Sequence, residues 1–246
     1  MSNPEGKVAI VTGASRGIGA SIAERLAGDG FAVVVNYAQS ARPAEELVRR
    51  IVESGGRASA FKADVSDPVA VGAMFEFAAK QFGGIDVLVN NAGILSQSTI
   101  ADTSDSDFDR LIAINLKGTF NALREGVKRI RNDGRIINFS TSLVGSLMPS
   151  YAIYAATKAA VETMTSIMAK ELRGRNITVN AIAPGPTATD MFLTGKSPEL
   201  IQQMAKVPPL ERLGTPDDIA GVVSFLAGRD AGWINGQTLR ANGGYV

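Results

Sequence analysis

An apolar run, a glycine-rich turn and a helical pattern open the chain and constrain its fold most. Residues 8–11, Val-Ala-Ile-Val, predict a buried strand, and residues 12–19, Thr-Gly-Ala-Ser-Arg-Gly-Ile-Gly, predict a turn. Four apolar residues then share one face of a helix: Ile22, Ala23, Leu26 and Ala27. A strand, a turn and a helix in this order aim unpaired N–H groups of the helix N-terminus at a phosphate. The spacing G-x-x-x-G-x-G differs from the common dinucleotide fingerprint, so the stretch alone also fits a simple strand–helix connection.

The alternation of strands and helices continues along the chain. Further strands are predicted at residues 31–36, 58–62, 85–89, 135–139, 177–182 and about 237–239. Helical patterns separate them, with long helices over about 104–130 and 150–172, and a substrate lid is expected at about 190–213. Right-handed crossovers then predict an α/β fold with one domain over residues 1–246. This domain is doubly wound and Rossmann-like, with a parallel sheet of about seven strands and helices on both faces.

Composition excludes several classes of function. The 25 basic and 24 acidic side chains give no electrostatic case for binding nucleic acid or an anionic membrane. No apolar run approaches membrane-spanning length, and the polar start lacks a signal-peptide pattern, so we expect a cytoplasmic protein. The chain has neither cysteine nor histidine, which excludes thiolate chemistry and removes the commonest general base and metal ligand. No metal site is expected.

Five polar or glycine-rich clusters each follow a predicted strand directly. They are residues 12–19, Asp64, residues 90–93, residues 140–142 and residues 184–189. In a doubly wound sheet the carboxyl ends of the strands share one edge, and ligands bind there near the change in strand order. The sequence therefore predicts one ligand site at that edge.

Tyr154 and Lys158 stand four residues apart in a predicted helix and so share one of its faces. A free tyrosine has a pKa near about 10, and a neighbouring ammonium brings that pKa toward neutrality. The pair therefore fits proton exchange with a substrate, although an ordinary helix with a surface lysine has the same spacing. Tyr151 has no such partner, because Ala155 stands four residues further on.

Several motifs occur together in a characteristic order. They are the glycine turn at 12–19, Asn-Asn-Ala-Gly at 90–93, Ser142, Tyr-Ala-Ala-Thr-Lys at 154–158 and Pro-Gly at 184–185. With these motifs the chain resembles the short-chain dehydrogenase/reductase family from about Lys7 to Val246. It is most similar to the NADPH-dependent carbonyl and 3-oxoacyl reductases of that family. The resemblance implies hydride transfer from the cofactor to a carbonyl carbon without a metal.

The resemblance implies roles for four catalytic residues. Tyr154 would exchange a proton with the substrate oxygen, and Lys158 would lower the pKa of Tyr154 and bind the nicotinamide ribose. Ser142 would hold the carbonyl oxygen, in preference to residues 140–141, because the family serine precedes a glycine by three positions. Asn115 would anchor a water in the proton relay, and a bond from its side chain to a backbone carbonyl is compatible with that role.

The resemblance also implies a site for NADPH or NADP+. Asp64 would bind the adenine amine beside Val65, or would only form a turn. Residues 91–93 would lie under the adenosine ribose, whereas Asn90 would tie strands together. The predicted cofactor residues are Gly13, Ser15, Arg16, Gly17, Ile18, Gly19, Asn36, Tyr37, Asp64, Val65, Asn91, Ala92, Gly93, Tyr154, Lys158, Pro184, Gly185, Thr187 and Thr189.

The end of the second predicted strand favours NADPH over NADH. An acidic residue there would bind the adenosine ribose and repel a 2′-phosphate, but the chain has Asn36, followed by Tyr37. Arg16 in the glycine turn is the first candidate to bind that phosphate, and Arg42 is a weaker second. The alternative is that Arg16 is solvated and Asn36 only caps a turn.

The predicted function is reversible, NADPH-dependent reduction of a ketone or aldehyde. One alternative is reduction of 3-oxoacyl thioesters on a carrier protein. Another is a dinucleotide-binding regulator without chemistry, against which the intact Ser142, Tyr154 and Lys158 argue. The segments expected to shape the substrate cleft, residues 143–153 and 191–207, are rich in apolar side chains and have no basic cluster. This favours an apolar small-molecule carbonyl compound.

The helix that begins near Tyr154 has two faces of low polarity. One carries Val161, Met164, Met168 and Leu172, and the other carries Ala156, Ala160, Thr163 and Ile167. A helix on a sheet needs one apolar stripe, so the second face needs a cover. The resemblance implies a two-fold partner helix in a homotetramer. The alternative cover is the long helix near Ile114 of the same subunit.

Overall fold

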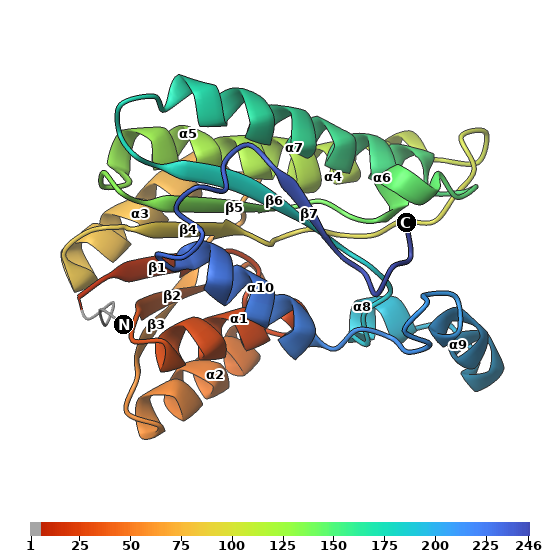
Figure 1. The fold of residues 1–246 in the computed structure, drawn as a ribbon, viewed down its shortest axis with the longest axis horizontal. Helices are drawn as coiled ribbons and strands as arrows, with labels where there is room; N and C mark the ends of the chain where they lie inside the picture. The colour runs from red at the N-terminus through yellow and green to blue at the C-terminus, as the bar shows by residue number, and fades with distance from the viewer. Residues whose placement is uncertain (1–5) are drawn as a thin grey trace.

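Seven parallel strands form one sheet in this computed structural model, which describes residues 6–246 (Figure 1). The strands are β1 (Val8–Val11), β2 (Ala32–Tyr37), β3 (Arg57–Lys62), β4 (Val87–Asn90), β5 (Arg135–Phe139), β6 (Thr178–Pro184) and β7 (Thr238–Ala241). Their spatial order is β3-β2-β1-β4-β5-β6-β7. The predicted α/β fold is confirmed. Because the order changes direction between β1 and β4, the switch point lies between these two strands.

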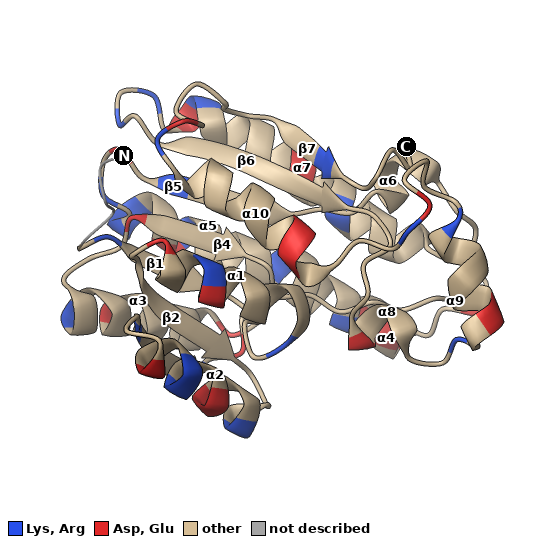
Figure 2. Ribbon diagram, turned by 60° about the horizontal axis from the view of Figure 1, so that its bottom comes forward, with Lys and Arg blue, Asp and Glu red and all other residues tan. Residues whose placement is uncertain are grey.

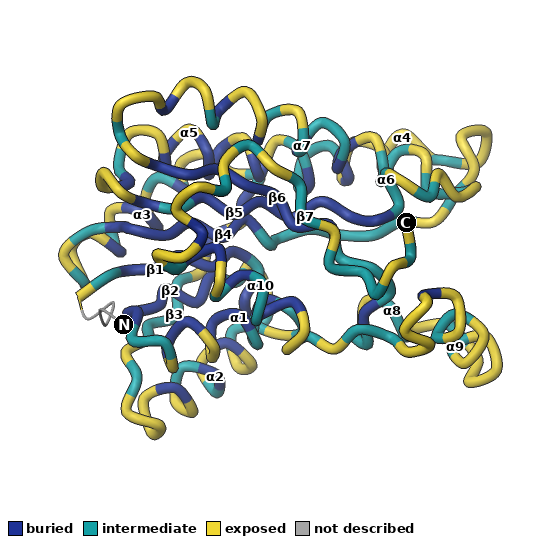
Figure 3. The backbone as a smooth tube through the Cα atoms, in the orientation of Figure 1, coloured by how far each residue is buried: buried dark blue, intermediate teal, exposed yellow. Residues whose placement is uncertain are grey.

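Burial on both faces explains the composition of the central strands. Every residue of β1 and β4 is buried. Strand β1 pairs with both of its neighbours, with Ala9 beside Val33 of β2 on one side and Val87 of β4 on the other. Strands covered on both faces are continuous apolar runs, because neither face meets water. The edge strands β3 and β7 are only partly buried, which agrees with their mixed composition (Figure 3).

Helices cover the two faces of the sheet in separate layers (Figure 1). One layer contains α1 (Gly17–Gly28), α2 (Ala41–Glu53) and α10 (Pro216–Ala227). The other contains α3 (Pro68–Phe82), α4 (Asp105–Leu111), η1 (Ile112–Gly118), α5 (Thr119–Arg129) and α7 (Ala152–Glu171). Each layer buries its own apolar cluster against the sheet, with Leu26, Leu47 and Leu226 in the first and Met74, Phe75 and Met168 in the second.

Two helix starts follow the expected capping chemistry. The Asp67 side chain accepts a hydrogen bond from the Val69 N–H, and Pro68 is the first residue of α3. Thr215 and Asp218 form a reciprocal capping box at the start of α10, again with proline in the first position. These caps fix where both helices begin.

The helix predicted over 104–130 is divided by a π-helical segment, η1. Asn115 and Gly118 are buried within it, and a Cβ on Gly118 would lie 2.6 Å from Val65 Cγ2. The Thr119 hydroxyl donates to the Asn115 carbonyl oxygen at 2.8 Å and so satisfies one group of the widened turn. The apolar spacing did not reveal this widened turn. Such turns occur often at functional sites.

The region expected to be irregular contains two helices, α8 (Asp190–Leu193) and α9 (Pro198–Ala205). Thr189 and Ser197 cap them by accepting bonds from Phe192 N and Leu200 N. A further short helix, α6 (Leu143–Ser146), follows β5. In Figure 1, α8 and α9 extend beyond the carboxyl edge of the sheet, at the position expected for a lid.

Positive and negative side chains alternate over the surface rather than forming separate patches, most visibly along α2 (Figure 2). Exposed pairs one helical turn apart join Arg42 to Glu46 and Arg49 to Glu53. Within residues 6–246, no helix has both the length and the apolar character that a membrane crossing requires. In the same range, no group of three or more acidic side chains is placed to hold a metal ion.

Candidate active site

The glycine turn between β1 and α1 packs too closely for side chains at two positions. Gly13 has φ +62°, and a Cβ there would lie 2.8 Å from Ala92 Cα. A Cβ on Gly19 would lie 2.4 Å from the Gly13 carbonyl oxygen. Arg16 precedes α1 without a side-chain cap, and the first turn of α1 has no acidic residue. Its N–H groups are therefore available to an anionic ligand, as the sequence predicts.

The segment after β4 is tied to this turn across the switch point. Asn91 Nδ2 donates to the carbonyl oxygens of Thr12 at 2.9 Å and Gly13 at 3.0 Å. Thr12 Oγ1 in return accepts from the N–H groups of Asn91 and Ala92. Asn90 donates to Asn138 Oδ1 of β5, which is the strand-tying role expected for it. Residues 91–93 thus lie directly beside the glycine turn.

Asn36 is buried and hydrogen-bonded within the fold. Its side chain is 1% exposed, its Oδ1 accepts from Gly13 N at 3.1 Å, and its Nδ2 donates to Ala63 O at 2.9 Å. The Asn36 amide thus joins the glycine turn to the segment after β3. Its place opposite the ribose stays a prediction. Tyr37, the half-buried last residue of β2, is the accessible side chain at this strand end.

The two candidate phosphate-binding arginines differ in their partners. Arg16 is exposed, and its side chain forms no hydrogen bond or ion pair within the described residues. Arg42 is paired with Glu46 at 2.8 Å, although exposed pairs of this kind contribute little. Arg16 is thus the arginine with its donors available.

Arg16 also lines a cleft of about 390 Å³ next to the glycine turn. The cleft is bounded by Arg16, Ile94, Leu95, Ser96, Asp107, Arg110, Leu111, Asp190, Met191 and Thr194. Sequence reasoning found Arg16 and Met191 but missed Arg110 and Asp107, because no motif surrounds them. A larger hollow of about 820 Å³ lies at the amino edge of the sheet near Gly30 and Gly56, away from every candidate residue.

Asp64 has the turn role that the sequence left open. Its Oδ1 accepts from both the N–H and the hydroxyl of Ser66, which leaves Oδ2 without a partner in the described chain. Val65 is buried beside η1. At the end of β6, Thr187 donates to the Gly185 carbonyl oxygen, and Thr189 lies against Gly17 of the glycine turn. The segments after β3 and β6 thus both lie near predicted cofactor residues, the first beside η1 and the second against the glycine turn.

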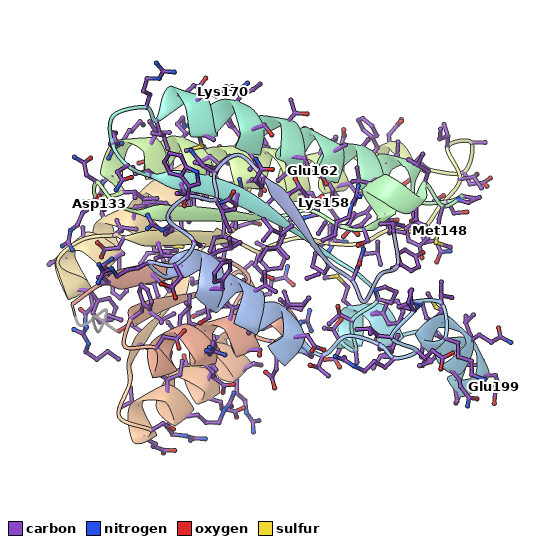
Figure 4. All side chains as sticks on the ribbon, in the orientation of Figure 1. Asp133, Met148, Lys158, Glu162, Lys170 and Glu199 are labelled. Carbon is purple, nitrogen blue, oxygen red and sulfur yellow. The ribbon has the colours of Figure 1, made fainter. Side chains whose placement is uncertain are left out.

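Two catalytic candidates, Asn115 and Lys158, meet at Gly93. A Cβ on this glycine would lie 3.3 Å from Asn115 Oδ1 and 3.4 Å from Lys158 Nζ. Asn115 is fully buried, and its side chain accepts from Ile94 N at 2.9 Å and donates to Ile94 O at 3.0 Å. Lys158 Nζ donates to the Phe139 carbonyl oxygen at 2.8 Å (Figure 4). The Asn115 side chain therefore bonds a backbone carbonyl, as the sequence allowed beside its predicted role in the proton relay.

The three hydroxyl residues after β5 have different partners. Ser140 donates to the carboxylate of Glu162, one turn beyond Lys158 on α7, and Thr141 is hydrogen-bonded to the Tyr154 hydroxyl. Ser142 Oγ donates to the Ala183 carbonyl oxygen at 3.1 Å and accepts from Asn242 Nδ2 at 3.0 Å. The bond from Asn242 was not predicted, because Asn242 lies in no motif that suggested it. Thr141 belongs to the predicted 140–142 cluster, but no pattern in the sequence indicated its pairing with Tyr154.

Burial dominates the pKa values of the Tyr154–Lys158 pair. It raises the pKa of Tyr154 to about 12, against the lowering effect of the hydrogen bond from Thr141. Burial also lowers the pKa of Lys158 to about 8. The Tyr154 pKa is thus raised in the protein alone, whereas the sequence predicts a lowered value, because burial of the phenol disfavours the phenolate. At neutral pH the phenol holds its proton.

The comparisons with known proteins agree with this geometry. A family model described as Enoyl-(Acyl carrier protein) reductase matches residues 13–246. A short-chain type dehydrogenase/reductase from Picea abies is 47% identical, over 98% of this chain and 93% of the relative. The chain belongs to the short-chain dehydrogenase/reductase family.

Two further members of the short-chain dehydrogenase/reductase family are described with their cofactor. An NADPH-dependent aldehyde reductase-like protein of Arabidopsis thaliana is 46% identical, over 98% of this chain and 94% of the relative. A short chain dehydrogenase from Burkholderia cenocepacia, solved in complex with NADP, is 37% identical. It superimposes with a TM-score of 0.93 and covers 99% of both chains. The similarity to these family members therefore covers nearly the whole chain.

We expect a Lys158→Met variant to lose its stability advantage over the wild type as the pH rises. Folded Lys158 has a pKa of about 8 and the unfolded side chain titrates near 10.5, so the unfolded wild type binds more protons between these values. The wild type therefore gains stability through that window, whereas the variant has no group to titrate there. Below about pH 8, Lys158 is protonated in both the folded and the unfolded wild type, so the folded protein bears the full cost of burying the charged ammonium.

Urea unfolding of both proteins at about pH 7 and about pH 10 measures this effect. The difference in unfolding free energy, variant minus wild type, should fall by about 2 kcal/mol between the two conditions. Other titrating groups are shared and cancel in the difference. A difference that does not change with pH would contradict the depressed pKa of Lys158.

Proposed function

We propose that this protein reduces ketones or aldehydes with NADPH, reversibly. The observation that carries the proposal is the meeting of Asn115 and Lys158 at Gly93, beside an uncapped helix N-terminus in the glycine turn. The described residues fit the cofactor, because the turn offers backbone N–H groups to its phosphates and Arg16 offers a free guanidinium. The NADPH named for relatives in the same family supports the assignment.

The chain contributes proton transfer and orientation to this reaction. NADPH, when bound, supplies the hydride that reduces the carbonyl carbon. Tyr154 supplies the proton to the carbonyl oxygen, and the raised pKa keeps its phenol in the donating form at neutral pH. Ser142 holds the carbonyl oxygen by its hydroxyl hydrogen. Lys158 places a positive charge near the ribose and the phenol, which favours loss of the proton from Tyr154 in the transition state.

An apolar carbonyl compound is the substrate that the surroundings favour. Leu147 is 77% exposed at the end of α6, and Met148 and Met191 are also exposed. The Tyr245 hydroxyl contacts Met148 Sδ, which brings the end of the chain to this rim (Figure 4). Exposed apolar side chains beside a catalytic site are available to cover an apolar ligand.

A 3-oxoacyl thioester is the alternative substrate. Measuring NADPH-dependent reduction of a panel of ketones, aldehydes and acyl thioesters distinguishes the two substrate classes.

The Tyr154→Phe variant tests the proposed mechanism. It removes the proton donor and preserves the shape of the side chain, so carbonyl reduction should fall by about 10²–10⁴-fold. NADPH binding, followed by fluorescence titration, should change little because the ring remains in place. Tyr151→Phe is the matched control and should keep most of the activity. Near-normal turnover of Tyr154→Phe would refute the mechanism.

We propose that Arg16, together with a tyrosine instead of an acidic residue at position 37, gives the preference for NADPH over NADH. A guanidinium with free donors binds a phosphate through charge-assisted hydrogen bonds. The neutral Tyr37 at the accessible end of β2 does not repel the 2′-phosphate. The buried Asn36 supports the turn from behind.

Arg16→Ala should raise the KM for NADPH by roughly 10- to 100-fold, the size of one charge-assisted hydrogen bond, and leave the KM for NADH nearly unchanged. Arg42→Ala is the control for loss of a nearby positive charge and should have little effect. Tyr37→Asp should shift preference toward NADH. Steady-state kinetics with both cofactors measure these effects, and a wild type that prefers NADH would overturn the assignment.

We also propose a homotetramer in which α7 contacts a partner helix. The second face of α7 is not covered within the subunit, because Ala156 and Thr163 are exposed and Ile167 is 50% exposed. The alternative cover by the helix near Ile114 therefore does not reach these residues. Phe120, near the start of α5, is also exposed.

Light scattering at micromolar concentration should give a species several times heavier than the 25.8 kDa chain. Ile167→Arg places a charge on the proposed interface and should shift the protein toward smaller species. Lys170→Ala, on an exposed position of the same helix, is the control and should not change the mass. A wild type that is only monomeric would contradict the tetramer.

A further inference from the structure

Asn242 lies immediately after β7, at the same edge as the catalytic candidates. Ala241, the last residue of β7, pairs with Pro184 of β6, and its carbonyl oxygen accepts from Gly185 N at 3.0 Å. A Cβ on Gly185 would lie 2.7 Å from Asn242 Cβ, so the two segments are in close contact. Ser142 N donates in turn to the Pro184 carbonyl oxygen at 2.9 Å. The ends of β5, β6 and β7 therefore bring Asn242 to Ser142, one hundred residues apart in the chain.

The amide of Asn242 is held in one orientation. Its Oδ1 accepts from the Gly244 N–H at 3.0 Å, so the nitrogen is directed toward the active site. Nδ2 donates to Ser142 Oγ at 3.0 Å and to the Val246 carbonyl oxygen at 3.3 Å. Both atoms of the amide group are thus bonded, and the side chain cannot rotate without losing these contacts.

The bond from Asn242 determines what the Ser142 hydroxyl is free to do. A hydroxyl has one hydrogen to donate and two lone pairs to accept with. Asn242 occupies a lone pair of Oγ, while the hydrogen points to the Ala183 carbonyl oxygen. When that hydrogen turns to a substrate oxygen, the bond from Asn242 still holds Oγ in place. Donation into Oγ also polarises the O–H bond and makes it a stronger donor.

We propose that Asn242 is a positioning residue for Ser142 in carbonyl reduction. It does not contact the substrate; it fixes Oγ and reserves the hydroxyl hydrogen for the carbonyl oxygen. This inference rests on the proposed reductase function, in which Ser142 holds that oxygen. Asn242 also anchors the end of the chain through Val246, so the test has to separate positioning of Ser142 from support of the tail.

A double-mutant cycle in kcat separates these two roles. Asn242→Ala should lower kcat for carbonyl reduction by roughly 10-fold in the wild-type background, the usual size of one hydrogen bond to a reacting group. In a Ser142→Ala background the same substitution should change the residual kcat by less than about 2-fold. The KM for NADPH should stay unchanged throughout. Equal losses in both backgrounds would show a structural role and overturn the proposal.

Asn242→Asp provides a second variant with nearly the same shape. It keeps an oxygen for the Gly244 N–H but replaces the donor to Ser142 with an acceptor, so the hydroxyl hydrogen turns toward residue 242. We expect kcat to fall at least as far as in Asn242→Ala, and the loss to increase above about pH 4, where the carboxylate forms. An Asn242→Asp enzyme with wild-type kcat would overturn the proposal.

Asn235→Ala is the matched control for loss of a structural asparagine. Asn235 Oδ1 accepts from Val179 N at 2.8 Å near the other end of β7, away from Ser142. This variant should be less stable than the wild type but keep kcat within about 2-fold. If the wild type reduces no carbonyl compound with NADPH, the proposed function fails and this inference fails with it. A wild type that turns over while Asn242→Ala remains fully active overturns the Asn242 proposal alone.

Discussion

Buried backbone groups at the carboxyl edge of the sheet need hydrogen-bond partners, and asparagine side chains supply them. Beyond the last bonds of a parallel ladder, the strand ends still carry N–H and C=O groups that are expensive to bury alone. Asn36 joins the glycine turn to the segment after β3, and Asn91 joins β4 to the end of β1. Asn115 closes on Ile94, and Asn242 joins the end of β7 to Ser142 after β5. An amide suits these positions because it donates and accepts at once.

These amides bond backbone groups of the scaffold, while other polar groups at the same edge remain available to a ligand. The N–H groups at the start of α1 have no side-chain cap, and Arg16 has no partner among the described residues. Lys158 is buried and Tyr154 is partly buried at this edge, so lost hydration is the main cause of the shift in both of their pKa values. The scaffold thus holds the catalytic groups in place and still leaves anion-binding capacity at the glycine turn.

Local pattern predicted most of the fold and of the site. The strands at 8–11 and 135–139 and the caps at Asp67 and Thr215 agree with the structure, because short-range chemistry determines them. The hydrogen bonds of Asn36 could not be predicted because they depend on β3, a strand twenty residues further along. The pKa of Tyr154 was expected in the wrong direction because burial is a property of the packed protein. Asn242 lies far from Ser142 in sequence, and only the order of β5, β6 and β7 brings them together.

The π-helical segment η1 shifts the helical periodicity between α4 and α5, so the buried faces of these two helices follow different residue spacings. Leu111 faces the interior before the widened turn, and Ala122 and Leu123 face it afterwards, with Asn115 directed to the site between them. An α-helix advances about 100° per residue, so the number of residues in the widened turn sets the rotation of everything that follows. Deleting one residue from this segment would turn all of α5 about its own axis. The length of seven residues is therefore as much a part of this site as the identity of Asn115.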